Sequence, residues 1–416
     1  MRKEILFSVW LMVMGFVRAG VADQEVPAEA QPDWQVIIAQ LRQQLHRMPG
    51  HAVTRQQLAT AYNNYAVSLA DQGRFVDATQ HLEEAMRLDP SNAQFRNNLV
   101  TIYLRMAQLA FQEHRLQDAK DAINHALALD PKETTALTLL GEIEYHSQRL
   151  NEAKHAWQQA LAINPALREV QEKLTQLNQE LPVELQFERL SQAYFDIRYP
   201  EEFERPIGFD IRDALLQARR VIGSDFAFWP KHKLIVLVYS TEQFRQLRQN
   251  TPDWVVGQYD GKIRVRLPMD ERDRDGAVRT LVHEYTHAIV HDLTHGRLPT
   301  WFNEGLAEYE AWKSQAPAWP ILRQAFVQGH LIPWTSLSTQ FSPALQAQEV
   351  VLAYEESHSI VRYLVERYGF WRIRRLLKAV DNQTPFEEAL TAELHVKLNR
   401  LEADWLKWLE KTLASH

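Results

Sequence analysis

The sequence predicts a multidomain protein in which an all-α array of helical hairpins precedes an α+β domain. Three observations carry this prediction. Helical phrases recur at a fixed interval in the first half, short β-branched runs alternate with helical segments after Pro182, and helical periodicity then continues nearly to the C-terminus. With 416 residues, of which 45% are hydrophobic and 24% charged, the chain is long enough for two or three folded domains.

The first residues predict a secretory signal peptide. The basic pair Arg2 and Lys3 precedes an apolar run from Ile5 to Val17, and small residues follow up to Ala22. Because the run is short for a membrane span, we expect cleavage after about Ala22 and a periplasmic or secreted protein; an uncleaved signal anchor is the alternative. No other segment is long and apolar enough to cross a bilayer, so no membrane span is expected after cleavage.

Composition excludes several kinds of site. The chain has no cysteine, which rules out a disulfide framework, a cysteine metal site and a lipid anchor on an N-terminal cysteine. Any zinc ligands must therefore be His, Asp or Glu. The formal net charge is -7 and there is no long run of lysine and arginine, so nucleic acid is not an expected partner.

The first half of the chain is internally repetitive. Three helical stretches end in the phrases RLDP, ALDP and AINP, and Pro131 and Pro165 lie 34 residues apart. That interval, and columns of small residues that let two helices approach closely, resemble tetratricopeptide repeats; an ordinary alanine-rich bundle is the alternative. The columns are Ala66, Ala107 and Gly141; Ala78, Ala119 and Ala153; and Ala85, Ala126 and Ala160, with the larger Leu82, Ile123 and Trp157 between the last two.

The repeat domain is placed at residues 33–181. Pro90 and Pro131 lie 41 residues apart, so one loop or helix between repeats should be longer by about two turns. The repeats are expected at about 59–92, 100–133 and 134–167, with a capping helix at 168–181.

The repeat resemblance implies a concave groove that holds a peptide or a partner protein. Four polar side chains on the first helices are placed to clamp a ligand backbone there, or else are simply solvated. They are Asn63, Asn64, Asn97 and Asn98.

The second domain is predicted at residues 190–416. Strands are expected at 193–200 and 233–240 and, as a pair joined by a tight turn, within 254–268. A helix is expected between Pro206 and Gly223, and helices follow the last strand. A sheet followed by helices is typical of an α+β domain.

The stretch HEYTH, residues 283–287, predicts a metal site on a helix that Asp273 or Asp275 would cap. His283 and His287 lie one turn apart, so both imidazoles can reach one metal ion. Glu284 lies beside them and is predicted to accept the proton of an attacking water molecule. A five-residue motif can occur by chance, so the prediction of a metal site requires a third ligand elsewhere in the sequence.

Glu304, seventeen residues after His287, supplies that ligand. It lies in WFNEGLAEY, which reads as a second helix able to fold back against the first after a loop closed by Gly296 and Pro299. Two histidines and one glutamate leave one of four zinc positions open, as in catalytic and not in structural zinc sites.

These motifs resemble those of the gluzincin metallopeptidases, the thermolysin-like and aminopeptidase-like group, and in particular the small MA-like peptidase domains. The family's second motif is Asn-Glu-x-x-x-Asp/Glu, and Asn303, Glu304 and Glu308 match it, with glutamate where the family has aspartate. The resemblance implies a zincin-like fold, Zn²⁺ as cofactor and Glu304 as third ligand. It also implies that Glu308 holds a ligand histidine through its far ring nitrogen.

Other polar residues are weaker candidates. The strand 262–267 is expected to be the sheet edge that pairs with an extended substrate, as the resemblance implies, although its Arg264 and Arg266 equally suit a solvent face. Tyr354 and His358 lie on a later helix and either stabilise a developing oxyanion or only pack. His291 and His295 continue the histidine spacing but lie too far along the helix to join the first site, and are taken as structural.

The sequence therefore predicts an exported zinc metallopeptidase whose repeats recruit a substrate or partner protein. The first alternative is a catalytically inactive repeat scaffold of an exported complex, against which the intact motif residues argue. The second keeps the metal but hydrolyses something other than a peptide. The sequence leaves open the substrate, endo- or exopeptidase action, the oligomeric state and the repeat face that binds.

Overall fold

The computed structural model describes residues 32–203, 205–247, 257–267, 274–313, 315, 318–342 and 345–414. The predicted signal peptide lies outside the described residues. The chain divides between Leu99 and Val100 into two compact units, and the division predicted between residues 181 and 190 falls within the second. None of the helices in the described ranges combines the length and apolar character that crossing a bilayer requires.

The first unit is built from helical hairpins. Its helices are α2 (Trp34–Arg47), α3 (Ala52–Asp71), α4 (Phe75–Leu88) and the beginning of α5 (Ala93–Gln112). The alanine columns explain the close packing of α3 on α4, because Ala66, Ala78 and Ala85 are completely buried around Leu82.

Asn63 is not placed to take part in the predicted ligand clamp. Asn63 is buried, and its side-chain oxygen accepts a 2.7 Å hydrogen bond from Asn98. The Asn63 amide also donates to Asn64 at 3.0 Å. The prediction was wrong for Asn63 because a buried amide needs internal partners, and here a neighbouring asparagine provides one.

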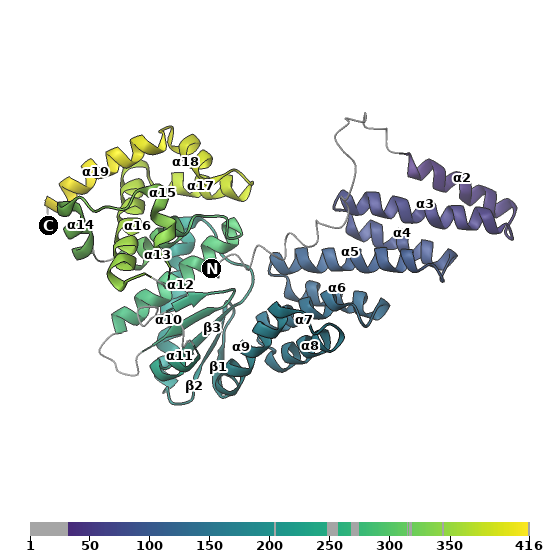
Figure 1. Cartoon of the computed structure of the whole chain (residues 1–416), viewed down its shortest axis with the longest axis horizontal. Coiled ribbons are helices and arrows are strands. Elements are labelled where there is room, and N and C mark those ends of the chain that lie inside the picture. The colour runs from purple at the N-terminus through teal and green to yellow at the C-terminus, as the bar shows by residue number, and fades with distance from the viewer. Residues whose placement is uncertain are drawn as a thin grey trace. The chain divides into compact units, whose positions relative to one another are not determined.

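The second unit begins with further hairpins made by α5, α6 (Leu116–Leu129), α7 (Thr134–His146) and α8 (Leu150–Ile163), closed by α9 (Arg168–Glu184). The predicted extra two turns are helical, since α5 has 20 residues whereas α7 has 13. Gly141 lies against the Trp157 ring so closely that any side chain there would collide with it. The described residues before the sheet are thus all-α, as predicted (Figure 1).

A five-stranded mixed sheet follows, in the order β1-β2-β3-β5-β4. The strands are β1 (Phe187–Ser191), β2 (Phe195–Pro200), β3 (Leu234–Tyr239), β4 (Gly257–Tyr259) and β5 (Ile263–Arg266). β2, β3 and β5 are parallel, and β1 and β4 are antiparallel edges. The expectation that 262–267 forms the edge was wrong, because β4 covers that side of β5.

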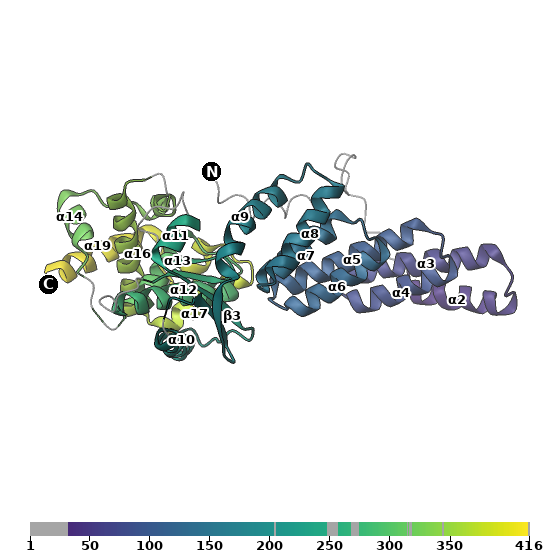
Figure 2. The same cartoon turned by 90° about the horizontal axis from the view of Figure 1, so that it is seen from below.

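Helices cover both faces of this sheet. Val236 and Val238 face the main core with α10 (Arg205–Phe226) and α12 (Arg274–Thr294), whereas Leu237 and Tyr239 face α9 and α11 (Thr241–Leu247). Burial on both faces explains the continuous apolar run of β3. The remaining helices are α13 (Thr300–Ala311), α14 (Pro320–Gln328), α15 (Trp334–Leu337), η2 (Ser338–Gln340), α16 (Ala347–Tyr368), α17 (Phe370–Asp381), α18 (Phe386–Leu394) and α19 (Leu398–Ala414), seen from two directions in Figures 1 and 2.

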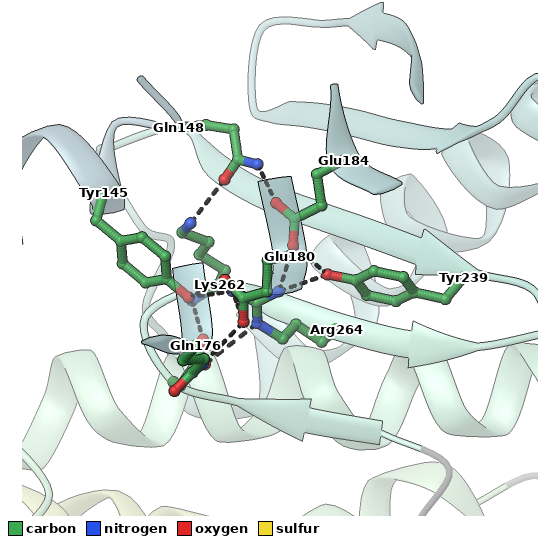
Figure 3. Close-up of polar contacts among 9 residues, drawn as sticks. Tyr145, Gln148, Gln176, Glu180, Glu184, Tyr239, Lys262 and Arg264 are labelled. Atoms are coloured by element: carbon green, nitrogen blue, oxygen red, sulfur yellow. Dashed lines mark hydrogen bonds and ion pairs between the residues drawn. The ribbon is translucent and has the colours of Figure 1, made fainter. Parts of the chain in front are cut away.

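A buried polar network joins the last repeat to the sheet (Figure 3). Arg264 of β5 is only 1% exposed and donates to Glu184 of α9 at 2.8 Å and to the Tyr145 hydroxyl at 2.7 Å. Lys262 donates to Gln148 at 2.6 Å and lies 3.7 Å from the centre of the Tyr145 ring. The alternative that Arg264 lies on a solvent face was therefore wrong.

Candidate active site

Two neighbouring helices position the predicted metal ligands. Helix α12 carries His283, Glu284 and His287, and α13 carries Glu304 and packs against it. The apolar residues of α12 are buried in the core. Their burial fixes the rotation of the helix and thereby the direction of the two histidines. Asp275 lies in the first turn of α12 and is not its cap, and Asp273 lies outside the described residues. The core residues of α12 are Leu281, Tyr285, Ala288, Ile289 and Val290.

Three donor atoms meet between these helices. Nε2 of His283 and Nε2 of His287 lie 3.0 Å apart, and Oε2 of Glu304 lies 3.4 and 3.3 Å from them. A tetrahedral ion with ligands at 2.0–2.1 Å has donor–donor edges of roughly 3.3 Å. The triangle made by the three side chains therefore has the size of one face of a tetrahedral zinc site.

Glu308 orients the first histidine. Its Oε1 lies 2.9 Å from Nδ1 of His283, and its Oε2 accepts a 2.9 Å hydrogen bond from the indole of Trp312. A proton held on Nδ1 leaves the Nε2 lone pair of His283 directed at the donor triangle. Burial tends to raise the pKa of Glu304, but the adjacent His287 and His283 lower it well below its usual range.

Glu284 is placed to handle protons. Its side chain is buried, and Oε2 has no hydrogen-bond partner among the residues that the structure describes. Burial raises the pKa of Glu284, although the two histidines oppose this. Edge strand β4 passes directly beside it, since a side chain at Gly257 would collide with the Glu284 carboxylate.

A cavity of about 840 Å³ opens onto these groups, the size of a pocket that encloses a small ligand or part of a larger one. Tyr354 lies on its wall, where burial, followed by the charge of the adjacent Glu304, keeps the pKa of the tyrosine well above its usual range; its side chain also forms a hydrogen bond with Glu304. His358 also lines the cavity, with its ring packed edge-on against Trp319. Other lining residues include Gly257, Arg266, Arg279, His283, Glu284, Glu308, Trp312 and Glu355.

Family models match both the repeat region and the C-terminal part of the chain. Residues 232–411 match the family model of the Peptidase MA superfamily. The C-terminal part of the chain is a Peptidase MA superfamily domain. Residues 57–132 and 104–167 match two tetratricopeptide repeat models. No curated protein matches the chain.

Solved structures with a distant likeness to the chain include a crystal structure of MamA. The crystal structure of MamA aligns with a TM-score of 0.23 and 20% sequence identity, over 36% of this chain and 80% of that chain. A likeness at this level carries no argument about function.

Sequence reasoning missed two residues of the Peptidase MA domain that shape the site. The first is Trp312, four residues after Glu308, whose indole N–H donates to the second carboxylate oxygen of Glu308. The guanidinium group of Arg279 lies 4.6 Å from the centre of the Trp312 ring. The helical spacing of Trp312 from Glu308 was a usable signal. Gly257 gave no such signal, because only the folded sheet brings β4 next to Glu284. His291 lies outside the donor triangle, with its ring against Tyr259.

Proposed function

We propose that this protein is an exported zinc-dependent metallopeptidase that hydrolyses peptide bonds. One observation carries the proposal: His283, His287 and Glu304 place three donor atoms at the spacing of a tetrahedral zinc site. The buried, unpartnered oxygen of Glu284 beside that triangle supports a catalytic and not only a structural role. Export rests on the predicted signal peptide.

The donor set fits zinc. Two imidazole nitrogens and one carboxylate oxygen match the ligands of hydrolytic zinc sites, which keep a fourth position open. When bound, zinc acts as a Lewis acid that lowers the pKa of water and polarises a carbonyl group. Glu308 holds His283 in the tautomer that presents Nε2 to the ion.

The remaining chemistry belongs to side chains of this chain. Glu284 accepts the proton of the attacking water at its free oxygen and delivers it to the nitrogen of the leaving amine. Tyr354 and His358, on the cavity wall, are the candidate donors to the carbonyl oxygen. The exposed side of edge strand β4 is placed to pair with an extended substrate next to Glu284, in the position that was predicted for the interior strand β5.

The repeats supply recognition in this proposal. Tetratricopeptide repeats form grooves that bind peptides and proteins, and the repeat models match residues 57–167. An unfolded or extended segment held by the repeats would be presented to the cavity of the Peptidase MA domain.

The test combines metal content with proteolysis on the purified full chain. His287→Ala should lower the zinc content, measured by mass spectrometry, by one ion per chain and abolish cleavage of an unfolded protein substrate. Glu284→Gln should retain zinc and lower the cleavage rate by about 10²–10⁴-fold. Equal zinc content in the parent and His287→Ala would overturn the proposal. Bound zinc without cleavage of any protein substrate would favour a scaffold, or a hydrolase of another bond.

A further inference from the structure

A second group of metal-binding side chains lies away from the candidate active site. It consists of His114 in the turn between α5 and α6, His232 in the loop before β3, and Asp292 near the end of α12. Nε2 of His114 lies 3.2 Å from Oδ1 of Asp292, and Nδ1 of His232 lies 3.7 Å from Oδ2. One donor atom from each residue lies within 4.8 Å of the other two.

His114 and Asp292 are close enough for an ion pair, but the two facing atoms make no hydrogen bond with each other. The Asp292 side chain is only 6% exposed. Its Oδ1 and the Nε2 of His114 are buried, and neither makes a hydrogen bond within the described part of the chain. A buried carboxylate oxygen left unsatisfied is costly, and a cation between the three donors would remove that cost.

The backbone presents His114 to this point. His114 has a φ of 55°, and its counterparts in the neighbouring repeat turns, Gly73 and Gln148, also have positive φ. Gln148 contacts Lys262 and Glu184. Within the second unit, the same turn position of two successive repeats thus places a side chain against polar groups of the sheet region or α12.

This group is separate from the active-site triangle. Asp292 follows His283 by nine residues, which at 3.6 residues per turn places the two on roughly opposite faces of α12. One ion cannot bind both. The rings of His114 and His232 are stacked, with centres 4.3 Å apart and planes 17° apart, and each ring has a nitrogen within 4 Å of a different oxygen of Asp292.

We propose that His114, His232 and Asp292 form a second site for a divalent transition-metal ion of the zinc class, which ties the α5–α6 turn to the helix that carries HEYTH. Two imidazoles and one carboxylate are ligands that zinc accepts, and a water molecule completes the coordination. The donors lie somewhat wider than the roughly 3.3 Å edges of a zinc tetrahedron, so binding draws the side chains together by small rotations. The site is structural and goes beyond the proposed peptidase activity.

The test counts bound metal in the full chain after removal of metal with a chelator and refilling with Zn²⁺ alone. The parent should bind two ions per chain. His232→Gln and Asp292→Asn should each bind one, His287→Ala should bind one, and His232→Gln combined with His287→Ala should bind none. His155→Gln, a substitution of an exposed histidine outside both groups, should still bind two.

The outcomes separate the two sites. A parent that binds one ion, lost in His287→Ala and kept in His232→Gln, overturns the second site and leaves the proposed peptidase intact. A parent that binds one ion, lost in His232→Gln and kept in His287→Ala, supports the second site and overturns the catalytic zinc.

A second measurement guards against loss of folding. In the His287→Ala background, Zn²⁺ should raise the melting temperature, because an ion that binds only the folded chain stabilises it. The added substitution His232→Gln should abolish that rise while the metal-free melting temperature stays close to that of His287→Ala. An equal rise in both proteins contradicts the site.

Discussion

Glu308 joins two aromatic side chains of the active site, with one carboxylate oxygen 2.9 Å from Nδ1 of His283 and the other accepting the Trp312 indole at 2.9 Å. Both oxygens are therefore engaged, and the ring of His283 is fixed. Replacing this carboxylate should weaken metal binding without removing a ligand.

We predict that Glu308→Gln lowers zinc affinity by about 10–100-fold, since partners that orient a ligand histidine have effects of this size. Competition with a chelator of known affinity measures it. Glu355→Gln is the matched control, because Glu355 lines the same cavity but accepts its hydrogen bond from the backbone of Leu322. Equal affinities for the two variants would show that Glu308 does not orient His283.

Gly257→Ala should damage catalysis more than metal binding. The added methyl group collides with the Glu284 carboxylate, and displacement of a catalytic group by about 1 Å can cost on the order of 10²-fold in rate. Proteolysis and zinc content, measured on the same preparation, test this. Gly50→Ala, which adds a methyl group in open space, serves as the control. Unchanged proteolysis by Gly257→Ala would mean that Glu284 has room to move.

Arg264→Met should destabilise the second unit by about 3–5 kcal/mol. It leaves the carboxylate of Glu184 buried beside the Tyr239 hydroxyl with its main counter-charge removed. Denaturant unfolding gives the difference in free energy. Arg245→Met, which removes an arginine that is 60% exposed on the surface of α11, should change it by less than about 0.5 kcal/mol. If Arg264→Met lowered the free energy of unfolding by as little as Arg245→Met, the buried polar network would contribute little to stability.

Glu356 should make stability depend on pH. This residue of α16 is buried, accepts the Ile332 N–H at 3.0 Å, and burial, with the charge of Glu402, raises its pKa from 4.5 to about 8. The folded chain then holds this proton more tightly than the unfolded chain. The stabilisation is fully present below about pH 4.5 and is lost as the pH rises through about 8.

Unfolding between pH 5 and pH 9 tests this prediction. The parent should lose stability relative to Glu356→Gln by a few kcal/mol over that range, on the order expected for a shift of several pKa units. Glu366→Gln, which removes a half-exposed glutamate of the same helix, provides the comparison. Parallel pH profiles for the parent and Glu356→Gln would contradict it.

The sequence predicted those features that follow from local spacing. Helical periodicity was enough to place His283 and His287 on one face of a helix and to set Glu308 one turn beyond Glu304, because i and i+4 positions share a helix face. The resemblance to the gluzincins, and not periodicity, brought Glu304 to the two histidines. The surplus of seven residues between prolines correctly indicated about two extra turns, without deciding between a loop and a helix; the turns are helical. Apart from the meeting of Glu304 with the two histidines, these inferences needed no knowledge of which elements meet.

Features that depend on pairing between distant elements could not be predicted in the same way. Alternation of apolar and polar residues predicts the two faces of a strand but not which strands lie beside it. For this reason β5 was predicted to be an edge strand, and the polar strand β1 was not predicted. The burial of Arg264 depends on α9 lying over it, and α9 was expected only to cap the repeats. His114, His232 and Asp292 come from three separate segments, and none of them stands in a motif.

Helix α9 also bears on how such a chain can be divided. A peptidase fragment that starts near residue 190 would lack Glu180 and Glu184, and its Arg264 and Lys262 would face solvent on a newly opened surface. Such a fragment should express poorly, whereas one that keeps α7, α8 and α9 retains these partners. In recombination between genes, the last hairpin and α9 would have to be inherited together with the sheet, while the helices before α5 can be gained or lost more freely.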